Sequence, residues 1–125
     1  MANISNNKRE TGRKGEDIAA NYLMNLGFEI EERNFRTGHL EIDIIAWDGE
    51  TMVVTEVKTI WVGIAPDPVL YLTRGQFLNL TRAASAYLSQ RLLTPEVRFD
   101  LVCVGLLHHP PHIRHFRDVW IATPR

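Results

Sequence analysis

Residues 40–58 read LEIDIIAWDGETMVVTEVK, and this segment decides the fold of the chain. It holds two apolar stretches rich in Ile, Val and Thr, residues that favour β-strands. Asp48-Gly49 between them is a typical two-residue hairpin loop, and a type I′ turn there would pair Trp47 with Glu50. The segment therefore predicts an antiparallel β-hairpin with an even-numbered loop.

The hairpin is expected to carry its charged side chains on one face. Because side chains alternate along a strand, this register places Asp43 and Glu56 on the same side, diagonal to each other. Carboxylates so placed repel each other unless a cation lies among them, which favours a divalent metal beside Lys58. The alternative is a hairpin with two solvated acids and a surface ion pair between Lys58 and Glu56. The predicted face comprises Glu41, Asp43, Val54, Glu56 and Lys58, with Glu41 directly opposite Glu56.

Such a group of side chains suits phosphodiester hydrolysis. Mg²⁺ and Mn²⁺ prefer carboxylate, carbonyl and water oxygens as ligands. A metal held in this way lowers the pKa of a bound water and polarises a phosphate oxygen. A neighbouring ammonium group orients that water and stabilises the charge that develops on the phosphoryl group. The pattern is thus typical of a metal-dependent phosphodiesterase.

A further acid, Glu16, lies on a predicted helix. This helix is expected from Thr11 to Leu26, with Gly27 as its C-terminal cap. Glu16 falls at the border of the apolar stripe, and an acid that faces the core usually needs a partner. The alternative is an ordinary acid of the first helical turn, favoured there by the helix dipole. The stripe is formed by Ile18, Ala19, Tyr22, Leu23 and Leu26.

Five short motifs occur in one order along the chain, namely Gly15-Glu16, Asn34-Phe35-Arg36, Glu41-Ile42-Asp43-Ile44-Ile45-Ala46, Glu56-Val57-Lys58-Thr59 and Arg98-Phe99-Asp100. Together they resemble the YraN family. These bacterial proteins are themselves similar to restriction-endonuclease-like and Holliday-junction-resolvase-like nucleases. The resemblance extends over residues 11–104, which is most of the chain.

The resemblance implies roles for individual residues. Asp43 and Glu56 would ligate Mg²⁺ or Mn²⁺ directly, with the Val57 carbonyl as a further ligand. Glu16 would act on the metal through a water, and Lys58 would position the nucleophile. The substrate would be DNA rather than RNA, in a structured or branched form. Further residues expected to support the site or to contact the substrate are Glu41, Gln76, Arg74 and Arg13.

Three positions depart from the family pattern. Leu40 stands where the family usually has Gly, Ile60 where it has Arg, and Gln76 where it has Lys. The last two changes remove cations that could touch phosphate. They favour a second hypothesis, a non-catalytic nucleic-acid-binding or assembly module that retains the nuclease fold. The complete set Glu16, Asp43, Glu56 and Lys58 favours the enzyme.

Composition and charge limit the class of protein. The 125 residues are 45% apolar and 23% charged, as in an ordinary globular domain. The net charge of −1 excludes a broadly basic protein, so any contact with nucleic acid has to come from a local patch. No stretch of ~18 apolar residues occurs that would cross a membrane. Cys103, the only cysteine, excludes an intrachain disulfide, suits the cytoplasm and is expected to be a buried small hydrophobe rather than a reactive thiol.

The expected element order is α-β-β-β-α-β, which predicts an α/β, restriction-endonuclease-like fold with a central mixed β-sheet flanked by helices. Residues 1–10 are polar and predict a flexible tail, which leaves residues 11–125 as a single nuclease-like domain. Besides the first helix and the hairpin, the pattern predicts a strand at 28–35, a loop at 60–72, a helix from Thr73 with Gln76 as capping-box partner, and strands at 98–106 and 112–116.

Other groups of residues have alternative interpretations. Four histidines around Pro110-Pro111 could bind zinc, but no cysteine accompanies them, and a solvated loop is favoured. Trp47 and Trp61 could stack on unpaired bases, but packing in the core or in a homodimer is favoured. Basic side chains could hold phosphates near the acids or be merely solvated. The histidines are His108, His109, His112 and His115, and the basic residues are Lys8, Arg9, Arg13, Lys14, Arg74 and Arg82.

Overall fold

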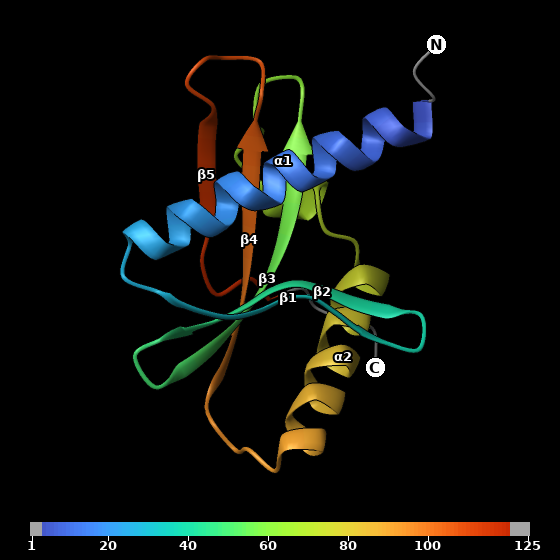
Figure 1. Ribbon diagram of the computed structural model, residues 1–125, viewed down its shortest axis with the longest axis vertical. Coiled ribbons are helices and arrows are strands. Elements are labelled where there is room, and N and C mark those ends of the chain that lie inside the picture. Colours follow the sequence, from blue (N-terminus) through green and yellow to red (C-terminus); the bar gives the residue numbers. More distant parts are fainter. Residues whose placement is uncertain (1–3, 121–125) are drawn as a thin grey trace.

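The computed structural model describes residues 4–120 of the chain, with side chains from residue 9 onward (Figure 1). The elements follow in the predicted order, and the strand predicted at 112–116 is present. They are α1 (Ile4–Asn25), β1 (Glu29–Thr37), β2 (Leu40–Asp48), β3 (Thr51–Ile60), the short 3₁₀ helix η1 (Pro68–Leu70), α2 (Arg74–Arg91), β4 (Val97–Gly105) and β5 (His112–Phe116).

The five strands form one mixed sheet in the order β1-β2-β3-β4-β5. Neighbouring strands are antiparallel except β3 and β4, which are parallel. Parallel neighbours need a crossover connection, and α2 lies in the one that joins β3 to β4. The predicted α/β fold, a restriction-endonuclease-like mixed sheet flanked by helices, is confirmed.

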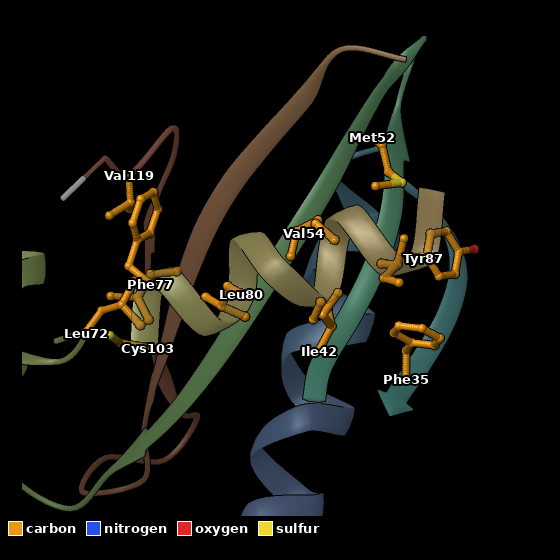
Figure 2. Close-up of a cluster of buried hydrophobic side chains, with 14 of the residues drawn as sticks. Phe35, Ile42, Met52, Val54, Leu72, Phe77, Leu80, Tyr87, Cys103 and Val119 are labelled. Atoms are coloured by element: carbon orange, nitrogen blue, oxygen red, sulfur yellow. The ribbon is translucent and has the colours of Figure 1, made fainter. Parts of the chain in front are cut away.

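The two helices cover opposite faces of the sheet. Ala19 and Leu23 of α1 share a buried cluster with Val53. Leu80 of α2 shares the other cluster with Val54, and Figure 2 shows this second cluster between α2 and the strands. Because β3 is buried on both faces, a charged group on it is costly unless it has a partner.

The first helix begins earlier than predicted. It starts at Ile4 rather than at Thr11, so the expected tail is helical from Ile4 on, while residues 1–3 lie outside the described part of the chain. Lys, Arg and Glu in this segment are good helix formers, and extending an existing helix needs no new nucleus. The predicted end is confirmed, because Gly27 has φ +94° and lies just after the helix.

The hairpin closes with a different loop from the predicted one. Asp48 pairs with Thr51, so the loop is Gly49-Glu50 rather than Asp48-Gly49. Gly49 has φ +61°, and a glycine at the first loop position is typical of a type II′ turn rather than type I′. The register therefore shifts by two residues, which keeps the predicted side-chain parity.

Helix α1 approaches the sheet closely at Gly15. A Cβ atom on this residue would overlap the hydroxyl oxygen of Thr59 on β3. Only glycine allows the helix to lie this near the strand. The close approach fixes the position of the next residue, Glu16.

Candidate functional site

Strands β2 and β3 separate beside the predicted acids. Their pairing ends at Ile44 and Thr55, and the β1–β2 hairpin diverges from β3 beyond that point (Figure 1). The next free backbone N–H on β3, that of Val57, donates to Asp43 Oδ2 at 2.8 Å. A carboxylate thus replaces a strand carbonyl as the acceptor. The N–H and C=O of a strand residue point to the same side, so the Val57 carbonyl also faces this gap.

Asp43 lies at a distortion of β2, where the alternation of its side chains between the two faces of the sheet is interrupted. Ile42 belongs to the cluster under α2, whereas Ile44 belongs to the cluster under α1. A regular strand would place both on the same face. Across from Asp43 on β1 lies Asn34, whose φ of 56° is left-handed. This distortion brings Asp43 near acids from both sides of the sheet.

Asp43 and Glu56 form a half-buried acid pair. The two carboxyl groups lie close enough for each to affect the pKa of the other. Burial and then the charge of Asp43 raise the pKa of Glu56 to about 8, against the opposing effect of Lys58. Burial also raises the pKa of Asp43. Lys58 Nζ lies 3.6 Å from Glu56 Oε1, and one ammonium group leaves the pair short of positive charge.

Glu16 reaches the same region from α1. Burial, followed by the charge of Asp43, raises the pKa of Glu16 to about 7, while Arg33 acts in the opposite direction. The Asn34 amide, oriented with its nitrogen toward the acids, lies 2.8 Å from Glu16 Oε1 and 3.2 Å from Glu41 Oε1. Asn34 therefore links two acids. The sequence marked it only as part of a motif, although a polar residue that tolerates left-handed backbone inside a strand is a usable signal.

Glu41 borders two hollows in the surface. One, of about 620 Å³, also contains Glu16 and the predicted Arg13. The other, of about 150 Å³, contains Glu56 and the predicted Gln76. Arg74 is not brought to the acids, since it lines a separate hollow with Trp120. The structure thus groups eight of the predicted residues around the strand separation: Arg13, Glu16, Glu41, Asp43, Glu56, Val57, Lys58 and Gln76.

The oxygens at the strand separation suit a hard cation. Within residues 9–120, no three carboxylate, imidazole or thiol groups converge into a complete metal site. Two carboxylates and the Val57 carbonyl are nevertheless the kind of ligand that Mg²⁺ and Mn²⁺ prefer, and Mg²⁺ usually keeps several waters. A divalent ion would also supply the positive charge that the acid pair lacks. The residues present therefore fit such an ion bound through few protein ligands.

A family model described as Uncharacterised protein family UPF0102 matches residues 15–104, which hold all four predicted catalytic side chains. The chain belongs to family UPF0102. A UPF0102 protein of Chlorobium chlorochromatii is 38% identical over 128 residues, covering 95% of this chain and 98% of the relative. One of Geobacter metallireducens is 38% identical over 118 residues, covering 94% and 97%. One of Thermotoga neapolitana is 38% identical over 110 residues, covering 88% and 97%. The YraN-family resemblance, which denotes this same family, is confirmed.

The last motif of the UPF0102 chain belongs to a separate cluster of charged side chains, formed around the buried Asp100 and away from the acid pair. Arg98 donates to both carboxylate oxygens of Asp100, at 2.9 and 3.0 Å, and to Asp48 at 2.9 Å. His115 Nε2 lies 2.7 Å from Asp100 Oδ2, and the Asp118 N–H donates to the same carboxylate. This cluster ties β4 to β2 and β5, so its role is structural.

Two expectations about histidine and tryptophan are partly wrong for this UPF0102 chain. His115 does not lie in a solvated loop, because it is part of β5 and its side chain is buried against Asp100 of β4. Its partner is distant in the sequence, so no local pattern could show this. Trp47 packs against the core under α2, as predicted. Trp61 is 59% exposed, so it does not pack in the core, and its packing in a homodimer stays a prediction.

Cys103 and the helices agree with the expectations from composition. Cys103 is fully buried, and burial raises the pKa of its thiol to about 11. It is a small core residue, as predicted. None of the helices in the described part of the UPF0102 chain has the length and apolar character needed to cross a membrane.

Proposed function

We propose that this protein is a metal-dependent nuclease that hydrolyses phosphodiester bonds of DNA, branched DNA included. The observation that carries the proposal is the half-buried Asp43–Glu56 pair, which lies where β2 and β3 separate, with Lys58 Nζ 3.6 Å from Glu56. Strongly shifted carboxyl pKa values beside a charge partner favour a functional site over a structural one.

Each residue would have a separate task. Asp43, Glu56 and the Val57 carbonyl would hold Mg²⁺ or Mn²⁺, with Glu16 acting through a water. The bound ion would supply Lewis acidity toward a phosphate oxygen and an activated water. Lys58 would orient the nucleophile and stabilise negative charge on the phosphoryl group. Glu41 would support Glu16 through Asn34, which contacts both.

A non-catalytic binding or assembly module is the second candidate, and two observations favour it. Ile60 is 8% exposed and belongs to the core under α2, so the cation usual at this position is absent. The Gln76 side chain accepts a hydrogen bond from the Thr73 backbone in a capping box. Its oxygen is thereby occupied with the helix cap rather than with a substrate.

A cleavage assay with Lys58→Ala separates the two candidates. In the enzyme, Lys58 acts mainly on the transition state, so the variant should lose about a hundredfold or more in turnover with little change in DNA affinity. The substrates should be branched, flapped, single-stranded and duplex DNA in Mn²⁺. Tight binding of branched DNA by the wild type without any cleavage would decide for the binding module.

The proposed activity would take place in the cytoplasm, with DNA and not RNA as the substrate. The only cysteine is buried and takes no part in a disulfide, which suits a reducing compartment. Whether two copies associate as a homodimer stays a prediction, to be tested by sedimentation of the purified chain.

A further inference from the structure

The larger of the two hollows beside the acids is lined mainly by arginines and acids. It has a volume of about 620 Å³. Its walls come from α1 and the β1–β2 hairpin, so it opens directly beside Glu16. The lining residues are Arg9, Gly12, Arg13, Glu16, Asn34, Arg36 and Glu41.

The arginines are arranged along a line that leads to the acids. Arg9, Arg13 and Glu16 lie at positions i, i+4 and i+7 and so share one face of α1. The two arginines are separated by about 6 Å along the helix axis. Arg36 stands on β1 across the hollow, with its side chain 74% exposed. The N-terminal turns of α1 project past β3 in Figure 1, so a long ligand can follow this face.

Two of these three arginines have no carboxylate partner among the described residues. Among the residues that the structure describes, neither Arg9 nor Arg13 forms an ion pair, and Arg36 has only a 3.7 Å contact with Glu41. Arg33, Arg91 and Arg98 are by contrast all paired with carboxylates. Arg9 and Arg13 are therefore available to phosphate, which arginines bind by charge-assisted hydrogen bonds, and Arg36 has only the weakest of the ion pairs.

We infer that this hollow binds the phosphates of one DNA strand, with the N-terminal half of α1 guiding that strand toward the acid pair. DNA as the ligand rests on the proposed function, whereas the path of its backbone follows from Arg9, Arg13 and Arg36. A locally positive track explains how a chain of net charge −1 would hold a polyanion.

The test is DNA binding without cleavage. Fluorescence anisotropy of labelled single-stranded and duplex DNA in EDTA, over a series of NaCl concentrations, gives the salt dependence of the affinity. The variant is Arg9→Gln/Arg13→Gln. The charge-matched control is Arg114→Gln/Arg117→Gln, two exposed arginines on and just after β5 at the far edge of the sheet. The Arg9/Arg13 variant should melt like the wild type, and the control, which loses cation–π contacts with Phe116 and Phe28, should stay folded with a slightly lower melting temperature.

Loss of two phosphate contacts should reduce the slope of log affinity against log salt by about 1.4 for single-stranded and about 1.8 for duplex DNA. The control should keep the slope of the wild type. Equal slopes for all three proteins, or equal losses in both variants, would overturn the inference. If the wild type binds DNA through Arg9 and Arg13 but cleaves none of the DNA substrates in Mn²⁺, the inferred DNA path is retained and only the proposed hydrolysis is overturned. A wild type that binds no DNA would overturn both.

Discussion

Two clusters of charged side chains lie on the same sheet, one around the buried Asp100 and one formed by the half-buried Asp43 and Glu56, and their negative charges are neutralised to very different degrees. Burial alone would raise the pKa of Asp100, but hydrogen bonds from His115 and Arg98 hold it below its usual range. The Asp43–Glu56 pair has one nearby ammonium group, and the pKa values of both carboxyls are raised. The first cluster is complete within the chain, whereas the second lacks positive charge.

This difference distinguishes a cluster with a structural role from a candidate functional site. A buried carboxylate with full partners holds strands together and needs nothing else. Half-buried carboxylates that repel each other lower the stability of the protein, and such pairs are found mostly at functional sites. In the proposed function, a bound divalent cation would supply the missing positive charge, and the phosphate of a substrate would be the group on which the site acts.

The largest expected effect is on the complete cluster. Asp100→Ala should destabilise the protein by about 3–5 kcal/mol, because it removes the carboxylate that pairs with the largely buried side chains of Arg98 and His115. Asp43→Asn at pH 8 without metal should instead stay within about 1 kcal/mol of the wild type or exceed it, since it relieves repulsion. Urea unfolding measures both. Equal losses in the two variants would remove the distinction between the clusters.

The pH dependence should have opposite signs at the two clusters. Glu56 and Glu16 have pKa values raised from 4.5 to about 8 and about 7, so they favour the folded state most at low pH. Without metal, that contribution should be lost as the pH rises from about 5 to about 8, by on the order of 3 kcal/mol for Glu56. The pKa of Asp100 is lowered, so its contribution is lost only on acidification below about 4. A Glu56→Gln variant with an unchanged stability profile between pH 5 and 8 would contradict this.

Metal should stabilise the protein through the acid pair. Mg²⁺ at 100 times its dissociation constant should add about 2.7 kcal/mol to the free energy of unfolding at pH 8. Glu56→Gln should reduce this gain strongly. Glu50→Gln, an exposed acid in the hairpin loop, should keep it and serves as the matched control. A similar gain in both variants would place the metal elsewhere.

The smallest expected effect concerns the close approach of α1. Gly15→Ala should cost about 1–3 kcal/mol, since the new methyl overlaps the Thr59 hydroxyl and moves Glu16 away from Asp43. Thr59→Ala in the same chain removes the overlapping atom and should restore most of that loss. A double-mutant cycle measured by thermal unfolding gives the coupling. Purely additive effects would mean that Gly15 does not set the helix position.

Much of the fold was predictable because local patterns determined it. The Asp48-Gly49 signal and the β-branched stretches predicted the hairpin and its even parity. They did not determine the register, since Gly49 can serve either position of a two-residue loop and strands buried on both faces lack the alternation that would set it. Helix α1 was predicted too short because its first turns carry no apolar stripe.

The acids of the candidate site could be predicted from the sequence, but the groups that hold them in place, Asn34 and the Val57 N–H, could not. Asp43, Glu56 and Lys58 were visible as costly charges in apolar strands, and family motifs pointed to Glu16. The bridging role of Asn34 depends on a left-handed residue in β1 and on the approach of α1, neither of which is a local property. The Val57 N–H to Asp43 contact likewise arises only because β2 and β3 separate.

The most direct test of the central contrast is the titration of the carboxyl groups by carbon-13 NMR, with and without Mg²⁺. Without metal, we predict that Glu56 titrates near pH 8, and that Asp100 stays ionised down to the acid limit of the fold. Saturating Mg²⁺ should lower the apparent pKa values of Asp43 and Glu56 and leave Asp100 unchanged. An ordinary pKa for Glu56 in the metal-free protein, or a titration of the acid pair that Mg²⁺ does not shift, would contradict the proposal that these acids form a metal site.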